Sequence, residues 1–319
     1  MILKMRLGLQ TTLRSRATVS GVGVHSGAPA QVVLQPADVN SGVVFLRTGL
    51  PGGRERLLEA KRSNVTHTEL CTMLGDASGA SVSTVEHLLA ALSGLQIDNV
   101  LVEIDGPETP IMDGSATEFV TAIDEAGIAQ QPRSRRYLKI VKPVRIERDG
   151  AYAEFVPAER GFRLDVEIDF QSPVIGRQRR VFDLDPVTFR REIARARTFG
   201  FVSDVKNLWQ AGFALGSSLE NSVAIDGNKI LNPEGLRYAD EFVRHKALDA
   251  IGDLSLAGAP IIGGYRTYRP GHRLNATALE ALFANRTAYE FVEAPTPRSF
   301  VKSFGTGAHV PAAAFAAID

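Results

Sequence analysis

Apolar and polar positions alternate in both halves of the chain, on either side of a short turn. Residues 32–46 alternate around Pro36-Ala37-Asp38, and residues 153–168 alternate around Pro157-Ala158-Glu159. Alternation with a period of two, interrupted by a turn, is typical of a β-hairpin with one buried face. Each half is therefore expected to contain such a hairpin.

An apolar helix with a histidine near its start follows the alternating segment in each half. The two helices include residues 85–89, with His87, and residues 243–247, with His245. From the turn proline to the helix histidine there are 51 positions in the first half and 88 in the second, a difference of 37. Two unrelated α+β domains would share such patterns, but the common order favours an internal duplication with an insertion in the second copy.

A polar, helix-poor segment near residues 130–136 is the expected domain boundary. We predict a first α+β domain over residues 1–130, a linker over 131–136, a second α+β domain over 137–295 and an Ala- and Pro-rich C-terminal tail over 296–319. In the second domain, residues 198–225 are expected to form a small β-α-β insert. Its helix should be capped by Asp204 and stopped by Gly212.

The composition is that of a globular protein with balanced charge. The 319 residues are 44% hydrophobic and 23% charged, and Lys+Arg and Asp+Glu both number 36. A net charge of zero argues against a general nucleic-acid binder, although it leaves room for a local basic patch. The single cysteine, Cys71, excludes an intrachain disulfide and a Cys-only zinc site, and it suits a reducing compartment.

Neither a signal peptide nor a membrane-spanning segment is expected. Residues 1–13 lack the apolar block and the cleavage site of a signal peptide, and the chain has no run of 18 apolar residues. We expect a cytoplasmic, monomeric protein with no transmembrane segment, for which peripheral contact with a membrane surface remains open.

Candidate metal ligands lie on the second of the two helices. The chain has six histidines, and His245 and Asp249 are spaced i and i+4, with Asp253 one turn further along. Residues with this spacing share a helix face, so an imidazole and a carboxylate can point at one divalent ion. The alternative is an ordinary ion pair on a solvated surface.

The first helix offers a second candidate group, Ser83-Thr84-Val85-Glu86-His87. Ser83 and Glu86 have the spacing of a capping box, which would give Glu86 a purely structural role. In the alternative, His87 is a metal ligand. Glu86, about 100° away around the helix, misses the metal but reaches a water bound to it.

A third histidine, His272, follows Pro270-Gly271 between an expected strand over 261–268 and a helix starting near Asn275. A loop histidine is either simply exposed or free to meet a ligand. Together, His87, His245 and Asp249 would leave one position of a metal open for water, as catalytic zinc sites do. Glu86 would accept the proton of that water and His272 would act as acid or oxyanion stabiliser.

Longer motifs surround these candidate residues. They are Gly21-Val22-Gly23-Val24-His25-Ser26-Gly27, Ser83-Thr84-Val85-Glu86-His87, Ile111-Met112-Asp113-Gly114-Ser115, Ala196-Arg197-Thr198-Phe199-Gly200-Phe201, the segment 242–253, and Pro270-Gly271-His272. With these motifs in this order, the sequence resembles the UDP-3-O-acyl-N-acetylglucosamine deacetylase family. The resemblance covers the chain from Thr12 to about Glu293.

The resemblance implies a fold and an activity. The fold is α+β: two similar domains, each a sheet with a helical layer, helices packed between the sheets, one small insert per domain, and the active site between the domains. The activity is zinc-dependent hydrolysis of the N-acetyl group of UDP-3-O-acyl-N-acetylglucosamine, which gives acetate in lipid A biosynthesis. The family implies a Gram-negative-type bacterium, with Zn²⁺ as the metal and Fe²⁺ as its possible replacement in the cell.

The resemblance also implies roles for individual residues. The family's zinc ligands match His87, His245 and Asp249, its general base matches Glu86, and its electrophilic histidine and that residue's carboxylate partner match His272 and Asp253. Thr198 matches the residue that holds the oxyanion. Lys246 and His25 match groups near the polar part of the substrate, and the equivalent of Asp169 and Phe170 lies near the uracil ring. The insert, with Phe199, forms a passage for the acyl chain.

One departure and two alternatives remain. Family members carry a Lys where this chain has Asp149-Gly150-Ala151, which puts one pyrophosphate contact in doubt; Arg177, Arg179 and Arg180 are the candidate substitutes. The alternatives are another metal-dependent amide or ester hydrolase acting on a nucleotide sugar, and a non-catalytic zinc-stabilised module that binds a UDP-sugar. A structural zinc would need a fourth protein ligand.

Overall fold

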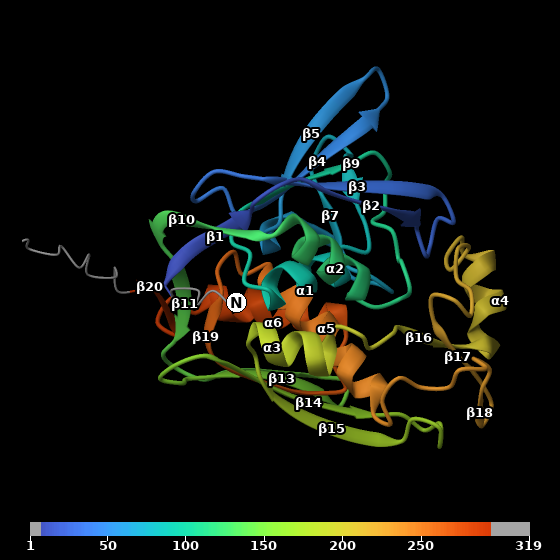
Figure 1. The fold of residues 1–319 in the computed structure, drawn as a ribbon. Helices are drawn as coiled ribbons and strands as arrows, with labels where there is room; N and C mark the ends of the chain where they lie inside the picture. The colour runs from blue at the N-terminus through green and yellow to red at the C-terminus, as the bar shows by residue number, and fades with distance from the viewer. Residues whose placement is uncertain (1–7, 295–319) are drawn as a thin grey trace, which may run out of the picture.

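Two sheets face each other across a layer of helices in the computed structural model, which describes residues 8–294 (Figure 1). The first sheet has five strands in the order β2-β3-β9-β4-β5. Their bounds are Ala17–Val22 for β2, Pro29–Pro36 for β3, Val100–Ile104 for β9, Val43–Leu50 for β4 and Arg54–Glu59 for β5. The expected α+β class is confirmed.

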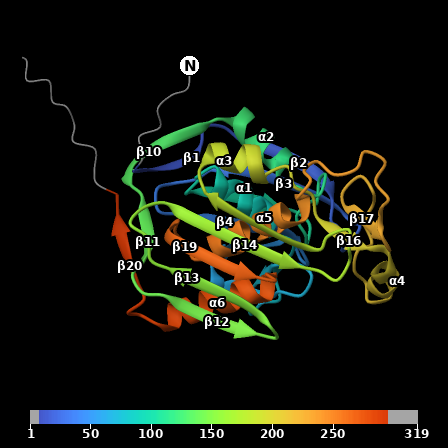
Figure 2. The same cartoon turned by 90° about the horizontal axis from the view of Figure 1, so that it is seen from below.

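The second sheet repeats this topology and adds two strands. Its core runs β12-β13-β19-β14-β15, and β11 and β20 extend it beside β19. The bounds are Val144–Arg148 for β12, Ala151–Val156 for β13, Ile261–Tyr268 for β19, Phe162–Asp169 for β14, Arg177–Asp183 for β15, Arg136–Ile140 for β11 and Tyr289–Glu293 for β20. Figure 2 shows this sheet from its outer side.

The expected hairpins are wrong in their pairing, and wrong in the same way in both halves. The alternating segments are strands, but β9 lies between β3 and β4, and β19 lies between β13 and β14. Each inserted strand is antiparallel to the first neighbour and parallel to the second. Local alternation identifies a strand but not its neighbours, because the inserted strand comes from far along the chain. The shared strand order supports the internal duplication.

The helices between the sheets come in matching pairs, one pair from each half. They are α1 (Glu86–Gly94) and α2 (Thr117–Ala126), and α5 (Glu241–Ser255) and α6 (His272–Ala284). α1 packs directly against α5, and almost every residue of both helices is buried. A helix buried all round cannot show a strong apolar stripe, so its position in the core follows from its neighbours and not from its periodicity.

A small insert accompanies each half. The first is a sheet of β6 (Val65–His67), β7 (Met73–Gly75) and β8 (Ser81–Val82), preceded by a short helix over Arg62–Asn64. The second contains β16 (Phe199–Phe201), α4 (Val202–Gln210), β17 (Val223–Asp226) and β18 (Lys229–Ile230), and it lies at one end of the molecule (Figures 1 and 2). The β-α-β insert is therefore present, with one additional strand. Asp204 does not cap its helix, which starts earlier, after Phe201.

A two-stranded sheet and a short helix are the remaining elements of the described residues. β1 (Leu9–Leu13) pairs with β10 (Ile128–Ser134), and α3 (Pro186–Thr188) continues into a turn of π-helix over Phe189–Ile193. Residues 131–136, expected to be a linker, thus lie mostly in β10 and at the start of β11. Their polar composition reflects exposed strand faces, and the domain limits stay a prediction. The expected tail over 296–319 lies outside the described residues.

Residues 8–294 include no helix long and apolar enough to cross a membrane.

Close packing of α1 on α5 depends on Gly252. A Cβ placed there would lie 2.0 Å from the carbonyl oxygen of Glu86, which is backbone and cannot swing away. Gly252→Ala should therefore lower the free energy of unfolding by about 1–3 kcal/mol, as overpacking usually does. Urea unfolding measures the change. Gly200→Ala is the control, because a Cβ there meets no atom within 4 Å. Equal stability of the two variants would show that the helices can separate without cost.

Candidate functional site

Side chains from three helices meet where α1 crosses α5. His87 comes from α1, and His245 and Asp249 come from one face of α5, so one half of the chain supplies one candidate ligand and the other half supplies two. Their candidate ligand atoms all lie within 4.8 Å of one another, and all three residues are buried. The His87 and His245 rings are 5.0 Å apart and nearly perpendicular. The structure thus brings the three predicted ligands together.

The donor set of this cluster fits a divalent cation. The His245 Nδ1–H donates to the Ala196 carbonyl at 3.0 Å, which leaves the Nε2 lone pair facing Asp249 Oδ1 at 3.3 Å. Burial lowers the pKa of His245 to about 3, so its ring is neutral. Asp249 Oδ1 has no hydrogen-bond partner among the described residues. A lone pair aimed at a buried carboxylate oxygen is repulsive, and a cation between the two atoms removes the repulsion.

Lys246 lies beside the cluster, and its positive charge offsets the negative charge of Asp249. Its Nζ donates to Asp249 Oδ2 at 2.8 Å, on the opposite oxygen from the histidines. Burial works against the charge of Lys246, but Asp249 raises its pKa overall. The lysine side chain is partly exposed, and its Nζ lies 5.5 Å from the centre of the Phe199 ring.

Glu86 lies near His87 and His272 and does not form a capping box. Its Oε2 accepts the Thr72 N–H at 3.0 Å, whereas Ser83 donates its hydroxyl to Pro107 O. The residue before α1 is Val85, and no side chain caps the helix. Burial raises the pKa of Glu86, while His272 and His87 oppose the rise. The structural alternative for Glu86, a bond to the helix start, is therefore absent.

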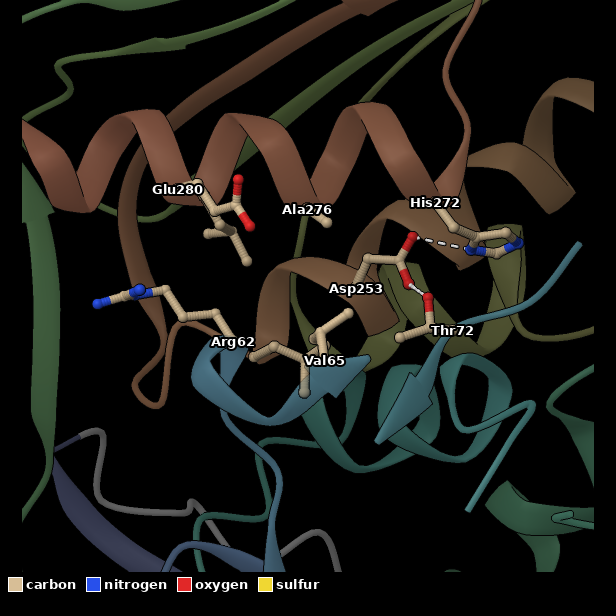
Figure 3. A pocket seen from close by; sticks show the side chains of 9 residues that line it. Arg62, Val65, Thr72, Asp253, His272, Ala276 and Glu280 are labelled. Carbon is tan, nitrogen blue, oxygen red and sulfur yellow. Dashed lines mark hydrogen bonds and ion pairs between the residues drawn. The ribbon is translucent and has the colours of Figure 1, made fainter. Parts of the chain in front are cut away.

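His272 is held by a carboxylate that is itself fully bonded. Its Nδ1 lies 3.0 Å from Asp253 Oδ2, and Asp253 also accepts from Thr72 Oγ1 at 2.6 Å and from Asn275 Nδ2 at 2.8 Å. Figure 3 shows Asp253 between His272 and Thr72. Burial lowers the pKa of His272, but Asp253 and Glu86 outweigh it and raise the pKa to about 9. The imidazole is therefore charged at neutral pH, with its Nε2 3.9 Å from Glu86 Oε1.

The sequence prediction for this third group was only partly correct. α6 begins at His272 itself and not near Asn275, because Gly271 is already the extended residue before the helix. His272 is thus a helix residue, and its ring is largely buried. Thr72 and Asn275 were missed, since nothing in their local sequence indicates that both bond to Asp253.

Among the residues assigned to substrate binding, His25 lies near His272, and Phe170 and Phe199 are linked to the cluster through ring contacts. Burial lowers the pKa of His25; Glu108 opposes this shift and nearby His272 adds to it. The Phe199 ring is 5.7 Å from Phe170 and 6.2 Å from His245, and so joins the Phe170 segment to the cluster.

Two further assigned residues are fixed by hydrogen bonds. Thr198 donates its backbone N–H to Gly114 O at 2.8 Å, so the first half of the chain holds it. Asp169 accepts the Tyr268 hydroxyl at 2.6 Å.

The arginines proposed as substitutes for the missing lysine are all paired. Arg177 bonds to Glu167, Arg179 to Asp165 at 2.7 Å, and Arg180 lies 2.8 Å from Asp240. Asp149 and Gly150 form the tight turn between β12 and β13, with φ angles of 51° and 74°. A pyrophosphate contact from these arginines would have to compete with existing ion pairs.

Fold and cluster together define a class: α+β proteins with a duplicated sheet-and-helix unit and a buried His-His-Asp group between the two copies. A family model described as UDP-3-O-acyl N-acetylglycosamine deacetylase matches residues 10–284. Curated proteins named UDP-3-O-acyl-N-acetylglucosamine deacetylase, from Brucella ovis and Brucella melitensis biotype 2, are each 51% identical over 286 residues, which is 89% of this chain and 99% of theirs. The chain belongs to the UDP-3-O-acyl-N-acetylglucosamine deacetylase family, as the sequence motifs predicted.

Removal of the Asp253 charge should lower the pKa of His272. In Asp253→Asn, the pKa should fall from about 9 toward the ordinary value of 6.5, because a neighbouring anion no longer favours the imidazolium. Heteronuclear NMR of the histidine side chains as a function of pH measures this shift. Glu280→Gln, on the exposed face of α6, removes the same charge at a distance and should leave His272 unchanged. A pKa that stays near 9 in Asp253→Asn would show that Asp253 is not the cause.

Proposed function

We propose that this chain hydrolyses the N-acetyl group of UDP-3-O-acyl-N-acetylglucosamine to acetate and UDP-3-O-acyl-glucosamine, as a zinc-dependent step of lipid A biosynthesis in the cytoplasm. The observation that carries the proposal is the position of the Glu86–His272 pair beside the His87, His245 and Asp249 cluster. The family and the printed names of the relatives support the substrate and the reaction.

His87, His245 and Asp249 would hold the metal. Two imidazoles and one carboxylate suit Zn²⁺, and Fe²⁺ accepts the same donor set in a cell where it is available. When bound, the ion would lower the pKa of a water molecule to about 7 and polarise the amide carbonyl. Only three protein ligands form the cluster within residues 8–294, which favours a catalytic centre over a purely structural one.

The remaining residues move the protons and stabilise charge. Glu86, ionised, accepts a proton from the attacking water as the new C–O bond forms. Protonated His272, kept charged by Asp253, and Thr198 stabilise the negative oxygen that develops on the amide carbon. As the C–N bond breaks, the departing nitrogen takes a proton, and at that stage both Glu86 and His272 carry one. The reaction balances as amide plus water to acetate plus the protonated amine.

The polar half of the substrate would be recognised by Lys246, His25 and the Asp169–Phe170 segment. The acyl chain would lie along the second insert, whose apolar residues have little core of their own to fill. α4 has no buried residue, and Trp209 and Leu215 are 55% and 54% exposed. Each methylene that such a surface removes from water contributes about 0.8 kcal/mol. We further propose that the protein acts as a monomer and that its contact with a membrane surface, where it occurs, is peripheral.

Two alternatives are less well supported. Another amide or ester hydrolase acting on a nucleotide sugar would use the same proton-transfer groups, and only the substrate would differ. A non-catalytic UDP-sugar module would not need Glu86 and His272 with their side chains 3.9 Å apart at the centre.

Loss of the base should abolish turnover without loss of the metal. In Glu86→Gln, kcat for acetate release from UDP-3-O-acyl-N-acetylglucosamine should fall by about 10²–10⁴-fold, because an amide cannot accept the proton. Metal content should stay at the wild-type level, since Glu86 is not a ligand. Ser83→Ala is the matched control: Ser83 makes no helix cap, so this variant should keep its activity. Near-normal kcat in Glu86→Gln with metal in place would refute the mechanism.

A further inference from the structure

One peptide unit, between Ala196 and Arg197, bridges two consecutive turns of α5. Its carbonyl accepts the His245 Nδ1–H at 3.0 Å, and its N–H donates to Glu241 Oε1 at 2.9 Å. Glu241 and His245 are spaced i and i+4, so both lie on the face of α5 that also carries Asp249. The peptide therefore links the first residue of the helix to the first metal ligand on it.

The geometry of the peptide bond makes this link directional. A trans peptide is planar, and its C=O and N–H point in opposite directions. An acceptor that fixes the N–H of Arg197 consequently fixes the direction of the Ala196 carbonyl. That carbonyl decides which nitrogen of His245 carries the proton, and hence that Nε2 presents its lone pair to Asp249 and to a metal.

Glu241 is itself held rigidly. It is completely buried, and its two oxygens also accept from the Arg197 side chain at 3.0 and 3.2 Å and from the Arg237 N–H at 2.6 Å. The Arg197 guanidinium is almost fully buried and donates in addition to Glu234 and to the Gly235 carbonyl. Separating the buried, fully hydrogen-bonded pair of Arg197 and Glu241 is costly, so the Glu241 carboxylate is held in a single orientation.

The next two peptide units are fixed as well. The Thr198 N–H, in the first of them, donates to Gly114 O, and the Thr198 carbonyl, in the second, accepts from the Val223 N–H, both at 2.8 Å. Arg197 is thus anchored through the peptide on each side of it, and the Ala196 carbonyl cannot rotate away without loss of several bonds. His87 has no comparable support, because its Nδ1 has no hydrogen-bond partner among the described residues.

We propose that Glu241 is a positioning residue of the metal centre, which acts on His245 through the Ala196–Arg197 peptide. This inference rests on the proposed metal centre but concerns a residue that touches neither metal nor substrate. Partners that orient a ligating histidine typically change metal affinity by about 10–100-fold when they are removed. Glu241 lies one step further out, and its rigid link should transmit most of that effect.

The test compares two neighbouring carboxylates at the start of α5. Glu241→Gln removes the negative charge that binds the Arg197 side chain and accepts the Arg197 N–H. Asp240→Asn removes the charge of the preceding residue, which pairs with Arg244 and Arg180. Both variants change the charge at the same helix end, but only Glu241 contacts the peptide. The Zn²⁺ dissociation constant, measured by competition with a chelating indicator, and the visible spectrum of the Co²⁺-substituted protein report on the centre without reference to activity.

In Glu241→Gln the affinity for Zn²⁺ should fall about 10–100-fold and the Co²⁺ spectrum should shift, whereas Asp240→Asn should keep both. Wild-type affinity in Glu241→Gln, or an equal loss in both variants, would overturn the inference. If Glu241→Gln does not fold, Arg197→Lys replaces it. A lysine cannot form both of the side-chain hydrogen bonds that Arg197 donates to Glu241, so this variant should bind Zn²⁺ several-fold more weakly. Unchanged Zn²⁺ binding would again overturn the inference. A wild-type protein without a stoichiometric metal would instead refute the proposed function.

Discussion

The contact between α1 and α5 determines the rest of the site. The two helices come from different halves of the chain and touch through backbone at Gly252 and Glu86. Only at this short separation do His87 on one helix and His245 and Asp249 on the other face a common point. The two sheets enclose these helices from either side. The repeated strand order shows that each half supplies the same sheet-and-helix unit.

Placing this site inside the helical layer has an electrostatic cost that the surrounding residues offset. Glu86, Asp249, Asp253 and Glu241 are all buried carboxylates. Each has a compensating partner: Thr72 and His272 for Glu86, Lys246 for Asp249, Asn275 and Thr72 for Asp253, and Arg197 for Glu241. A buried carboxylate without a partner is costly to keep in the protein interior, so these contacts lower the cost of burying the four side chains. The same contacts hold Glu86 and His272 in place.

The sequence contained enough to predict the class of fold and the three side chains that the structure brings together, but not their surroundings. Spacing along one helix placed His245, Asp249 and Asp253 on one face, because helical period is a local property. The neighbours of β9 and β19 could not be predicted locally, since strand pairing depends on segments far apart. For the same reason the sequence did not reveal Thr72 beside Asp253 or Glu241 behind His245. The sequence also did not decide whether Glu86 caps its helix. In the structure its carboxylate accepts the Thr72 N–H instead.

Metal content of the wild-type protein and of His87→Ala shows whether the two halves of the chain share a metal, because His87 is the one proposed ligand from the first half. The wild-type protein should contain one equivalent of divalent metal, lose acetate release after treatment with a chelator, and recover it when one equivalent of Zn²⁺ is added. His87→Ala, folded, should retain neither stoichiometric metal nor activity. If His87→Ala binds one equivalent with wild-type affinity, the two halves do not share a metal and the proposed centre is wrong.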